Sequence, residues 1–98
     1  MVVFSQPAKD DLRHIYEFIA VDSALYAHKV IQSIVNHIQQ LETFPESGRV
    51  VPELNDDSIR EIIHDNYRII YRIKNAIEVI AIIHAKRNFE YSINDRIK

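Results

Sequence analysis

Four side chains in the second half of the sequence could act on a phosphate or bind an anion. They are Arg60, Arg68, His84 and Arg87. Arginine presents a fork of N–H donors that matches a phosphate or a carboxylate, and histidine changes its charge near neutral pH. Such a group could bind a polyanion or support phosphoryl transfer. The alternative is that these charges only solvate an open sheet face, which alternating polar and apolar residues would also produce.

Three further residues extend this candidate site. Glu53 is a loop acid followed by an apolar residue, and it could act as a general base if the loop folds over the arginines. Otherwise it is a solvated loop charge. Arg72 shares the strand parity of Arg68, which makes it a candidate for binding. Tyr91 could stack on a base or cap a pocket.

The residue types that hold metals or cofactors do not form a matching pattern. The chain has no cysteine, which excludes a disulfide scaffold, a thiolate metal site and cysteine catalysis. His14, His28 and His37 have no carboxylate at the spacing of a metal site, so we interpret them as surface or boundary residues. Gly48-Arg49 lacks the glycine spacing of a phosphate loop. We therefore expect no metal and no cofactor.

The elements that must position these residues begin with a short strand and two helices. Residues 2–4 are typical of a strand, and apolar residues then recur at spacings of three and four over 5–20 and again over 22–43. This period predicts two helices, each with one apolar face. The second helix must end before Pro45, because the residue before a proline disfavours the helical backbone.

After the helices, the sequence predicts a loop and then three strands. Residues 45–58 hold the only glycine and two of the three prolines, so they are predicted to form a loop. The period then changes to two, and residues 59–64, 67–73 and 77–84 are rich in Ile, Val and Tyr, as in strands joined by hairpin turns. The tail, residues 86–98, could be a short helix or an ordered arm.

Together these elements predict an α+β fold with the order β-α-α-β-β-β, in a single domain over residues 1–98. The helical hairpin should pack on one face of a small, mainly antiparallel sheet, and the first strand should pair with the three-stranded meander. The last strand is apolar at both parities, so both its faces should be covered for part of their length. The rest of the second sheet face is expected to stay open.

Charge is distributed unevenly along the chain. The formal charge is −2, but residues 1–58 carry four basic and nine acidic groups, whereas residues 59–98 carry eight basic and five acidic groups. A binding face depends on the local field, so the sheet half could attract an anion despite the negative total. There is no basic leader and no apolar run near ~18 residues, so we expect a cytoplasmic protein without membrane contact.

Six short motifs extend over nearly the whole chain. In order they are residues 5–12 (SQPAKDDL), 44–49 (FPESGR), 52–54 (PEL), 59–62 (IREI), 67–72 (YRIIYR) and 80–87 (IAIIHAKR). In this order and spacing they resemble the RelE/ParE toxin superfamily of bacterial type II toxin–antitoxin systems, often labelled plasmid stabilisation proteins. The resemblance implies a growth-arresting toxin held inactive by a cognate antitoxin in a hetero-oligomer.

The superfamily divides by target, and one branch consists of nucleases. RelE-like members cleave mRNA on the ribosome. Arg68 resembles the strand arginine of the members similar to YoeB, and Glu53 resembles their loop glutamate. Arg87 resembles a later arginine of RelE, while His84 and Tyr91 lie near its carboxy-terminal His or Tyr. The resemblance then implies attack of the ribose 2′-hydroxyl on the adjacent phosphate, with the arginines stabilising the developing charge.

The other branch, ParE-like, inhibits DNA gyrase and has no known nuclease site. The near-neutral charge, the long second helix and the ending IIHAKR at 82–87 resemble this branch. A charge of −2 and the lack of a lysine run are unfavourable for binding ribosomal RNA. We therefore expect a gyrase inhibitor, which is not an enzyme, ahead of a ribosome-dependent mRNA endoribonuclease. A non-toxic binding module of the same fold is a third alternative.

Overall fold

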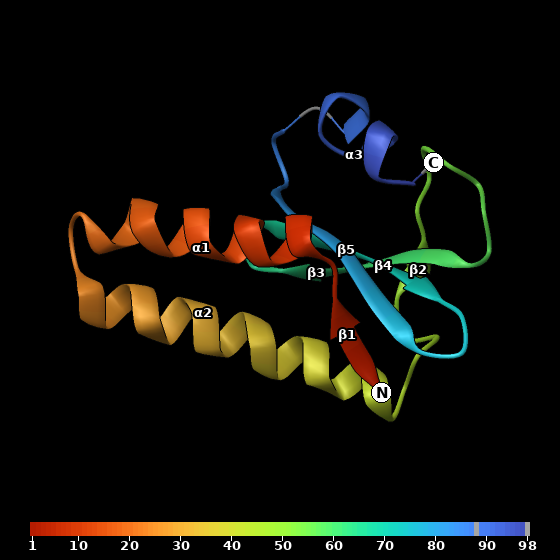
Figure 1. Ribbon diagram of the computed structural model, residues 1–98, viewed down its shortest axis with the longest axis horizontal. Helices are drawn as coiled ribbons and strands as arrows, with labels where there is room; N and C mark the ends of the chain where they lie inside the picture. The colour runs from red at the N-terminus through yellow and green to blue at the C-terminus, as the bar shows by residue number, and fades with distance from the viewer. Residues whose placement is uncertain (88, 98) are drawn as a thin grey trace.

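Figure 1 shows the computed structural model, which describes residues 1–87 and 89–97, without the side chains of 90–92 and 94. The elements are β1 (Val2–Phe4), α1 (Gln6–Ala20), α2 (Ala24–Gln39), the 3₁₀ helix η1 (Gln40–Glu42), β2 (Arg49–Val50), β3 (Ile59–His64), β4 (Tyr67–Ile73), β5 (Ile77–His84) and α3 (Phe89–Ile97). The predicted α+β class is confirmed, and the tail forms a helix. None of the described helices is long and apolar enough to cross a membrane.

Both long helices start at a serine cap. The Ser5 hydroxyl accepts a hydrogen bond from the amide of Ala8 at 3.2 Å, and the Ser23 hydroxyl accepts one from Tyr26 at 3.1 Å. Each cap satisfies a backbone N–H that has no partner within its helix. α2 ends at Gln39, earlier than the predicted residue 43, because the chain tightens into η1 over its last turn.

Five strands form one mixed sheet in the order β1-β5-β4-β3-β2. β1 runs parallel to β5, and all other neighbours are antiparallel. The first strand therefore pairs with the meander, as predicted. In the turn between β3 and β4, Asp65 has a φ of 52°, a left-handed conformation that aspartate adopts more readily than most residues.

Apolar residues occupy both alternating sets of positions in β5, and the strand contains a β-bulge. Ile70 pairs with Ala81 but Tyr71 pairs with Val79, so Ile80 is an extra residue in β5. Val79 belongs to the core beneath α1 and α2, whereas Ile80 and Ala81 both belong to a second core on the opposite face. Both faces of β5 are covered, as its composition predicts.

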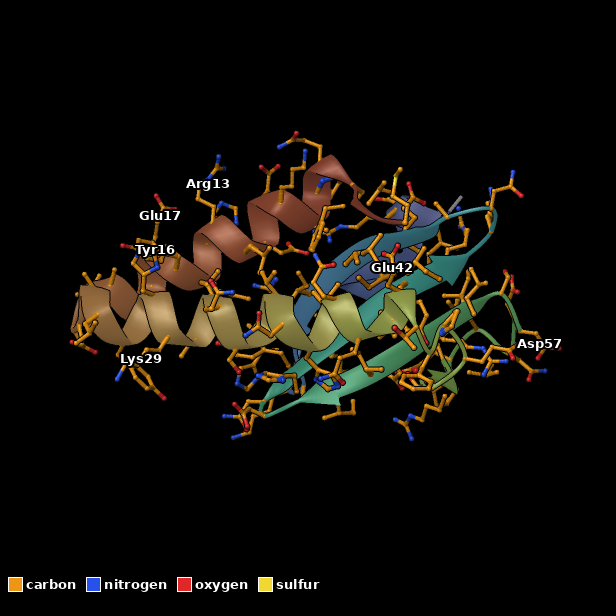
Figure 2. The ribbon with its side chains drawn as sticks, turned by 90° about the horizontal axis from the view of Figure 1, so that it is seen from below. Arg13, Tyr16, Glu17, Lys29, Glu42 and Asp57 are labelled. Carbon is orange, nitrogen blue, oxygen red and sulfur yellow. The ribbon has the colours of Figure 1, made fainter. Side chains whose placement is uncertain are left out.

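The sheet lies between two helical layers. α1 and α2 cover one face and α3 lies over the other (Figure 1). Figure 2 looks onto the hairpin from outside, where Arg13, Glu17 and Lys29 project away from the strands. The prediction of an open second face is wrong, because Phe89 and Ile93 of α3 are buried against it. That second core consists of Val51, Ile59, Ile70, Ile80, Ala81, Ile83, Phe89 and Ile93.

The segment between η1 and β3 is held down by Tyr71 and contains β2. The Tyr71 hydroxyl donates to the Pro45 carbonyl at 2.7 Å and accepts from the Gly48 amide at 3.0 Å. A Cβ on Gly48 would lie 2.5 Å from both the Glu61 carbonyl oxygen and the Tyr71 hydroxyl, so only glycine permits this approach. The chain then pairs with β3, and the loop prediction is therefore wrong at residues 49–50.

Candidate functional site

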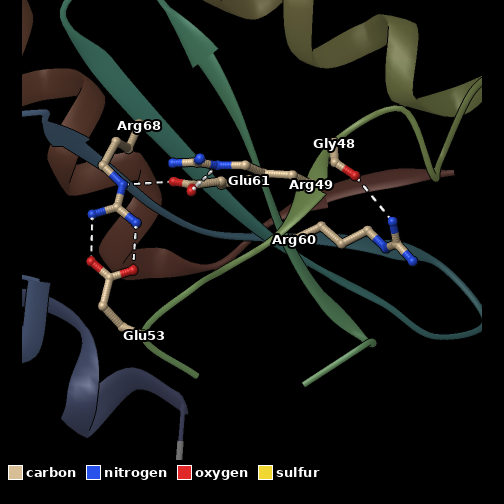
Figure 3. A network of polar contacts seen from close by, with 6 residues as sticks. All are labelled: Gly48, Arg49, Glu53, Arg60, Glu61 and Arg68. Atoms are coloured by element: carbon tan, nitrogen blue, oxygen red, sulfur yellow. Dashed lines mark hydrogen bonds and ion pairs between the residues drawn. The ribbon is translucent and has the colours of Figure 1, made fainter. Parts of the chain in front are cut away.

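Arg68 lies at the centre of a polar network on the sheet face that α3 covers (Figure 3). Its two terminal nitrogens donate to the two carboxylate oxygens of Glu53, each at 2.9 Å. Its Nε donates to Glu61 Oε1 at 2.6 Å. The guanidinium also lies over the ring of Phe89, 5.0 Å from the centroid, in a cation–π arrangement. The loop therefore folds over Arg68, and each of the three guanidinium nitrogens donates a hydrogen bond to a carboxylate.

Glu61 is the buried anchor of this network. It is only 1% exposed, and its second oxygen accepts a hydrogen bond from Arg49 Nε at 2.7 Å. The pairing of β2 with β3 places Arg49 directly opposite Glu61. Because a buried carboxylate is costly unless it is paired, Glu61 holds both Arg49 and Arg68 in place.

The hydrogen bonds of the network favour the ionised form of Glu53. The hydrogen bonds from Arg68 lower the pKa of Glu53 below its usual range, although partial burial opposes this shift. In turn, the hydrogen bonds to Glu53 and Glu61 raise the pKa of Arg68 above its already high ordinary value, against the effect of burial. A glutamate with a lowered pKa is a weak proton acceptor, so the pair is better suited to holding the loop than to moving protons.

Arg60 and Arg72 contact the backbone in other parts of the molecule. Arg60 pairs with Tyr71, so it lies on the opposite sheet face from Arg68, and it donates to the carbonyls of Gly48 at 3.0 Å and Asp57 at 3.2 Å. Figure 3 shows Arg60 pointing away from the network. Arg72 donates to the Ile97 carbonyl of α3 at 3.0 Å. Both arginines therefore tie segments of the chain to the sheet.

His84 and Arg87 come together at the end of β5. The Arg87 amide donates to the His84 carbonyl at 2.9 Å, and residues 84–87 are all exposed. His84 faces the hairpin side of the sheet, because it pairs with Tyr67 and its ring meets the edge of the tyrosine ring at 5.8 Å. The structure thus brings His84 and Arg87 together, and it places the side chain of His84 on the opposite sheet face from Arg68.

These two residues line a pocket of about 400 Å³, which we name the rim pocket. Its other walls include Asp11, His14 and Phe18 of α1 and Tyr67 of β4. Asp11 is 8% exposed and has partners for both oxygens, since Arg96 of α3 donates to them at 2.6 and 3.0 Å and the Ile82 amide donates at 2.9 Å. The carboxylate of Asp11 in the pocket wall is therefore already paired with Arg96 of α3.

Several of these residues have no counterpart in the sequence predictions. Glu61 did leave a signal, because it is the one acid in a strand of isoleucines and shares the parity of Ile59 and Ile63. Asp11 and Arg96 are 85 positions apart, and nothing in their spacing indicates that they meet. The side chain of Tyr91 lies outside the described part of the structure. Among the described residues, no group of three His, Asp or Glu side chains is close enough to hold a metal ion.

Comparisons with known proteins identify the family from one match and support the fold from another. The family model described as "ParE toxin of type II toxin-antitoxin system, parDE" matches residues 2–89. Among solved structures, a chain of the "Chromosomal ParDE TA system from P. aeruginosa" has the same fold, with a TM-score of 0.74 and 21% identity over 87% of this chain and 95% of that chain. No curated protein matches significantly in sequence. Because the family model spans every element up to the start of α3, the chain belongs to the ParE toxin family of type II toxin–antitoxin systems.

Proposed function

We propose that this chain arrests growth by inhibiting DNA gyrase, and that an antitoxin encoded with it holds it inactive. Membership of the ParE family supports both parts of this proposal. The chain would act in the cytoplasm, where gyrase works on the chromosome. It would act by binding a protein surface and not by catalysis.

The occupied guanidinium of Arg68 is the observation that carries the choice of gyrase over mRNA. A ribonuclease of the RelE type would need this arginine to contact a phosphate, but its three donor nitrogens already bind Glu53 and Glu61. His84 lies on the other face of the sheet, so it could not act on the same phosphate. A protein target needs no such convergence of catalytic groups.

We assign the contact with gyrase to the exposed turn at residues 84–87. This turn carries His84, Lys86 and Arg87, and all three are exposed. By contrast, the guanidinium groups of Arg60 and Arg72 are bound to backbone carbonyls. Of the arginines that the sequence singles out, Arg87 is therefore the one best placed to meet a partner.

The nuclease alternative is favoured by one contact, the pairing of Glu53 with Arg68. The strand arginine and the loop glutamate do meet, at 2.9 Å, as a RelE-like site would require. Glu53→Gln separates the alternatives, because the amide can still bond Arg68 but cannot accept a proton. We expect Glu53→Gln to arrest growth like the wild type. Ribosome-dependent mRNA cleavage by the wild type that is lost in Glu53→Gln would contradict our proposal.

The direct test is a gyrase supercoiling assay with purified protein. We expect the wild type to inhibit supercoiling, and Lys86→Glu with Arg87→Glu to require at least about tenfold more protein, because reversed charges repel a complementary surface. The matched control is Arg13→Glu with Lys29→Glu, which makes the same charge change on the outer face of the hairpin (Figure 2). Equal inhibition by the two double variants would overturn the assignment of the turn. Undiminished supercoiling with wild-type protein would overturn the gyrase proposal.

A further inference from the structure

Two histidines meet on the hairpin side of the sheet, among residues that the proposed function does not use. His37 lies on α2 between Ile34 and Ile38 of the core, and His64 is the last residue of β3. Their Nδ1 atoms are 3.0 Å apart, and their ring centroids are 5.1 Å apart. The two residues are separated by 27 positions in the sequence, so the local spacings that indicate metal sites do not include this pair.

The distance between the two nitrogens is close to that between two imidazole ligands of one metal ion. Imidazole nitrogen binds Zn²⁺ at about 2.0–2.1 Å, so two such ligands at a tetrahedral angle have nitrogens roughly 3.3 Å apart and ring centroids roughly 5 Å apart. His37 and His64 therefore need only a small rotation of their rings to hold one ion. In the metal-free protein, the two nitrogens share one proton in a hydrogen bond instead.

The ring of His64 is already oriented for a metal ligand. Ser33 lies one turn before His37 on the same face of α2, and its hydroxyl is 2.6 Å from His64 Nε2. The carboxylate of Asp65 lies 3.7 Å from the same nitrogen. An oxygen acceptor and a negative charge at Nε2 favour the tautomer that carries its proton there, which leaves the lone pair of Nδ1 facing His37. Histidines that bind metals typically have such a partner on the other ring nitrogen.

The surroundings of the pair suit a cation of one chemical class. Both histidines are half-buried, whereas Ser33 and Asp65 are exposed, so an ion can approach from solvent. Two protein ligands leave the other coordination positions to water, and we therefore expect reversible binding. Imidazole nitrogen suits Zn²⁺, Ni²⁺ and Cu²⁺, whereas Mg²⁺ and Ca²⁺ prefer oxygen ligands.

We propose that His37 and His64 bind one divalent transition-metal ion through both Nδ1 atoms, with Ser33 as a positioning residue. An ion held in this way joins α2 directly to the end of β3. Because the two ligands come together only in the folded chain, binding stabilises the fold. The site contains none of the residues at 84–87 that we assign to the contact with gyrase, so this inference goes beyond the proposed function and does not depend on it.

The test is a calorimetric titration of the untagged full chain with zinc chloride at neutral pH. We expect one Zn²⁺ to bind per chain, and magnesium chloride to give no binding. His37→Gln and, separately, His64→Gln should weaken Zn²⁺ binding at least about tenfold, because each removes one of the two ligands. The matched control is His28→Gln, since His28 is exposed on the same helix. It should bind Zn²⁺ like the wild type.

Two further measurements test the geometry of the site. Ser33→Ala keeps both ligands but frees the ring of His64, so it should weaken Zn²⁺ binding about tenfold. Long-range proton–nitrogen NMR spectra of the wild type should show Zn²⁺ shifting Nδ1, and not Nε2, of both histidines. Absence of Zn²⁺ binding by the wild type would overturn the proposal, as would coordination through Nε2 or undiminished affinity in His37→Gln and His64→Gln. Undiminished affinity in Ser33→Ala would overturn the positioning role of Ser33.

Discussion

At the scale of single residues, Arg68 is as much a structural residue as a candidate functional one. It neutralises Glu61, which is buried, and it fixes the loop through Glu53. Removing one member of a buried ion pair leaves an uncompensated charge, which costs more free energy than the pair itself contributes. A loss of toxicity in an Arg68 variant would therefore not by itself identify a catalytic group.

Arg68→Ala should lower the free energy of unfolding by about 3 to 5 kcal/mol, because Glu61 would keep only Arg49 as its partner. Urea denaturation followed by circular dichroism measures this change. Arg49→Ala is the matched control. Its side chain is 64% exposed, so its loss should cost about 1 kcal/mol or less. Equal losses in the two variants would contradict the central role given to Arg68.

At the scale of elements, the packing of α2 on β3 includes a contact between two histidines. His37 Nδ1 of α2 and His64 Nδ1 of β3 are 3.0 Å apart, and the Ser33 hydroxyl lies 2.6 Å from His64 Nε2. Burial, and to a lesser degree the charge of His64, lower the pKa of His37 below its ordinary 6.5. The packing of α2 on β3 therefore favours the neutral form of His37.

This contact predicts that stability falls as the pH drops below about 6.5. The unfolded chain binds a proton at His37 near its ordinary pKa of 6.5, whereas the folded chain does so only at lower pH. The stability that the neutral form of His37 contributes is thus complete above pH 6.5. It is lost as the pH falls from there through the lowered pKa of His37 in the folded state. The slope contributed by His37 cannot exceed about 1.4 kcal/mol per pH unit.

His37→Gln should reduce the slope of the unfolding free energy between pH 7 and pH 5, since glutamine does not titrate. Urea titrations at a series of pH values measure this slope. His28→Gln is a suitable control, because His28 is exposed on the same helix. An unchanged slope in His37→Gln would show that other groups cause the pH dependence.

At the scale of the whole molecule, one sheet supports two cores. The core under the hairpin contains Ile34, Ile69 and Tyr71, and the core under α3 contains Ile70 and Ile93. Neighbouring residues of β4 thus belong to different cores, because successive side chains of a strand point to opposite faces. The same strands therefore support both cores. Loss of one core would expose one face of the strands on which the other core is built.

Ile93→Ala should therefore destabilise the whole chain and not only α3. Ile93 is fully buried, so its truncation should cost about 2 to 5 kcal/mol. Far-ultraviolet circular dichroism and tyrosine fluorescence, the latter reporting in part on Tyr71 in the other core, should give the same urea midpoint. Two separate midpoints would mean that α3 and its core unfold independently of the hairpin.

Much of the fold could be predicted because the relevant signals are local. The serine caps, the change of period from 3.6 to 2 and the strand boundaries follow from backbone sterics and the burial of one face of each element. The sequence also shows that Glu53 belongs to the loop, but its contact with Arg68 depends on how that loop folds. By contrast, the two-residue strand β2 is too short to produce a periodic signal.

The sequence by itself determined the α+β class, the helical hairpin, the meander and the family resemblance, because these depend on short-range pattern and on the order of motifs. Only the tertiary structure decided which polar residues meet. Strand register placed Arg60 and Arg68 on opposite faces, and α3 covered the face expected to be open. Such contacts join residues far apart in the chain, as Asp11 and Arg96 do. Register and docking depend on how whole faces fit together, and residue spacing does not encode that fit.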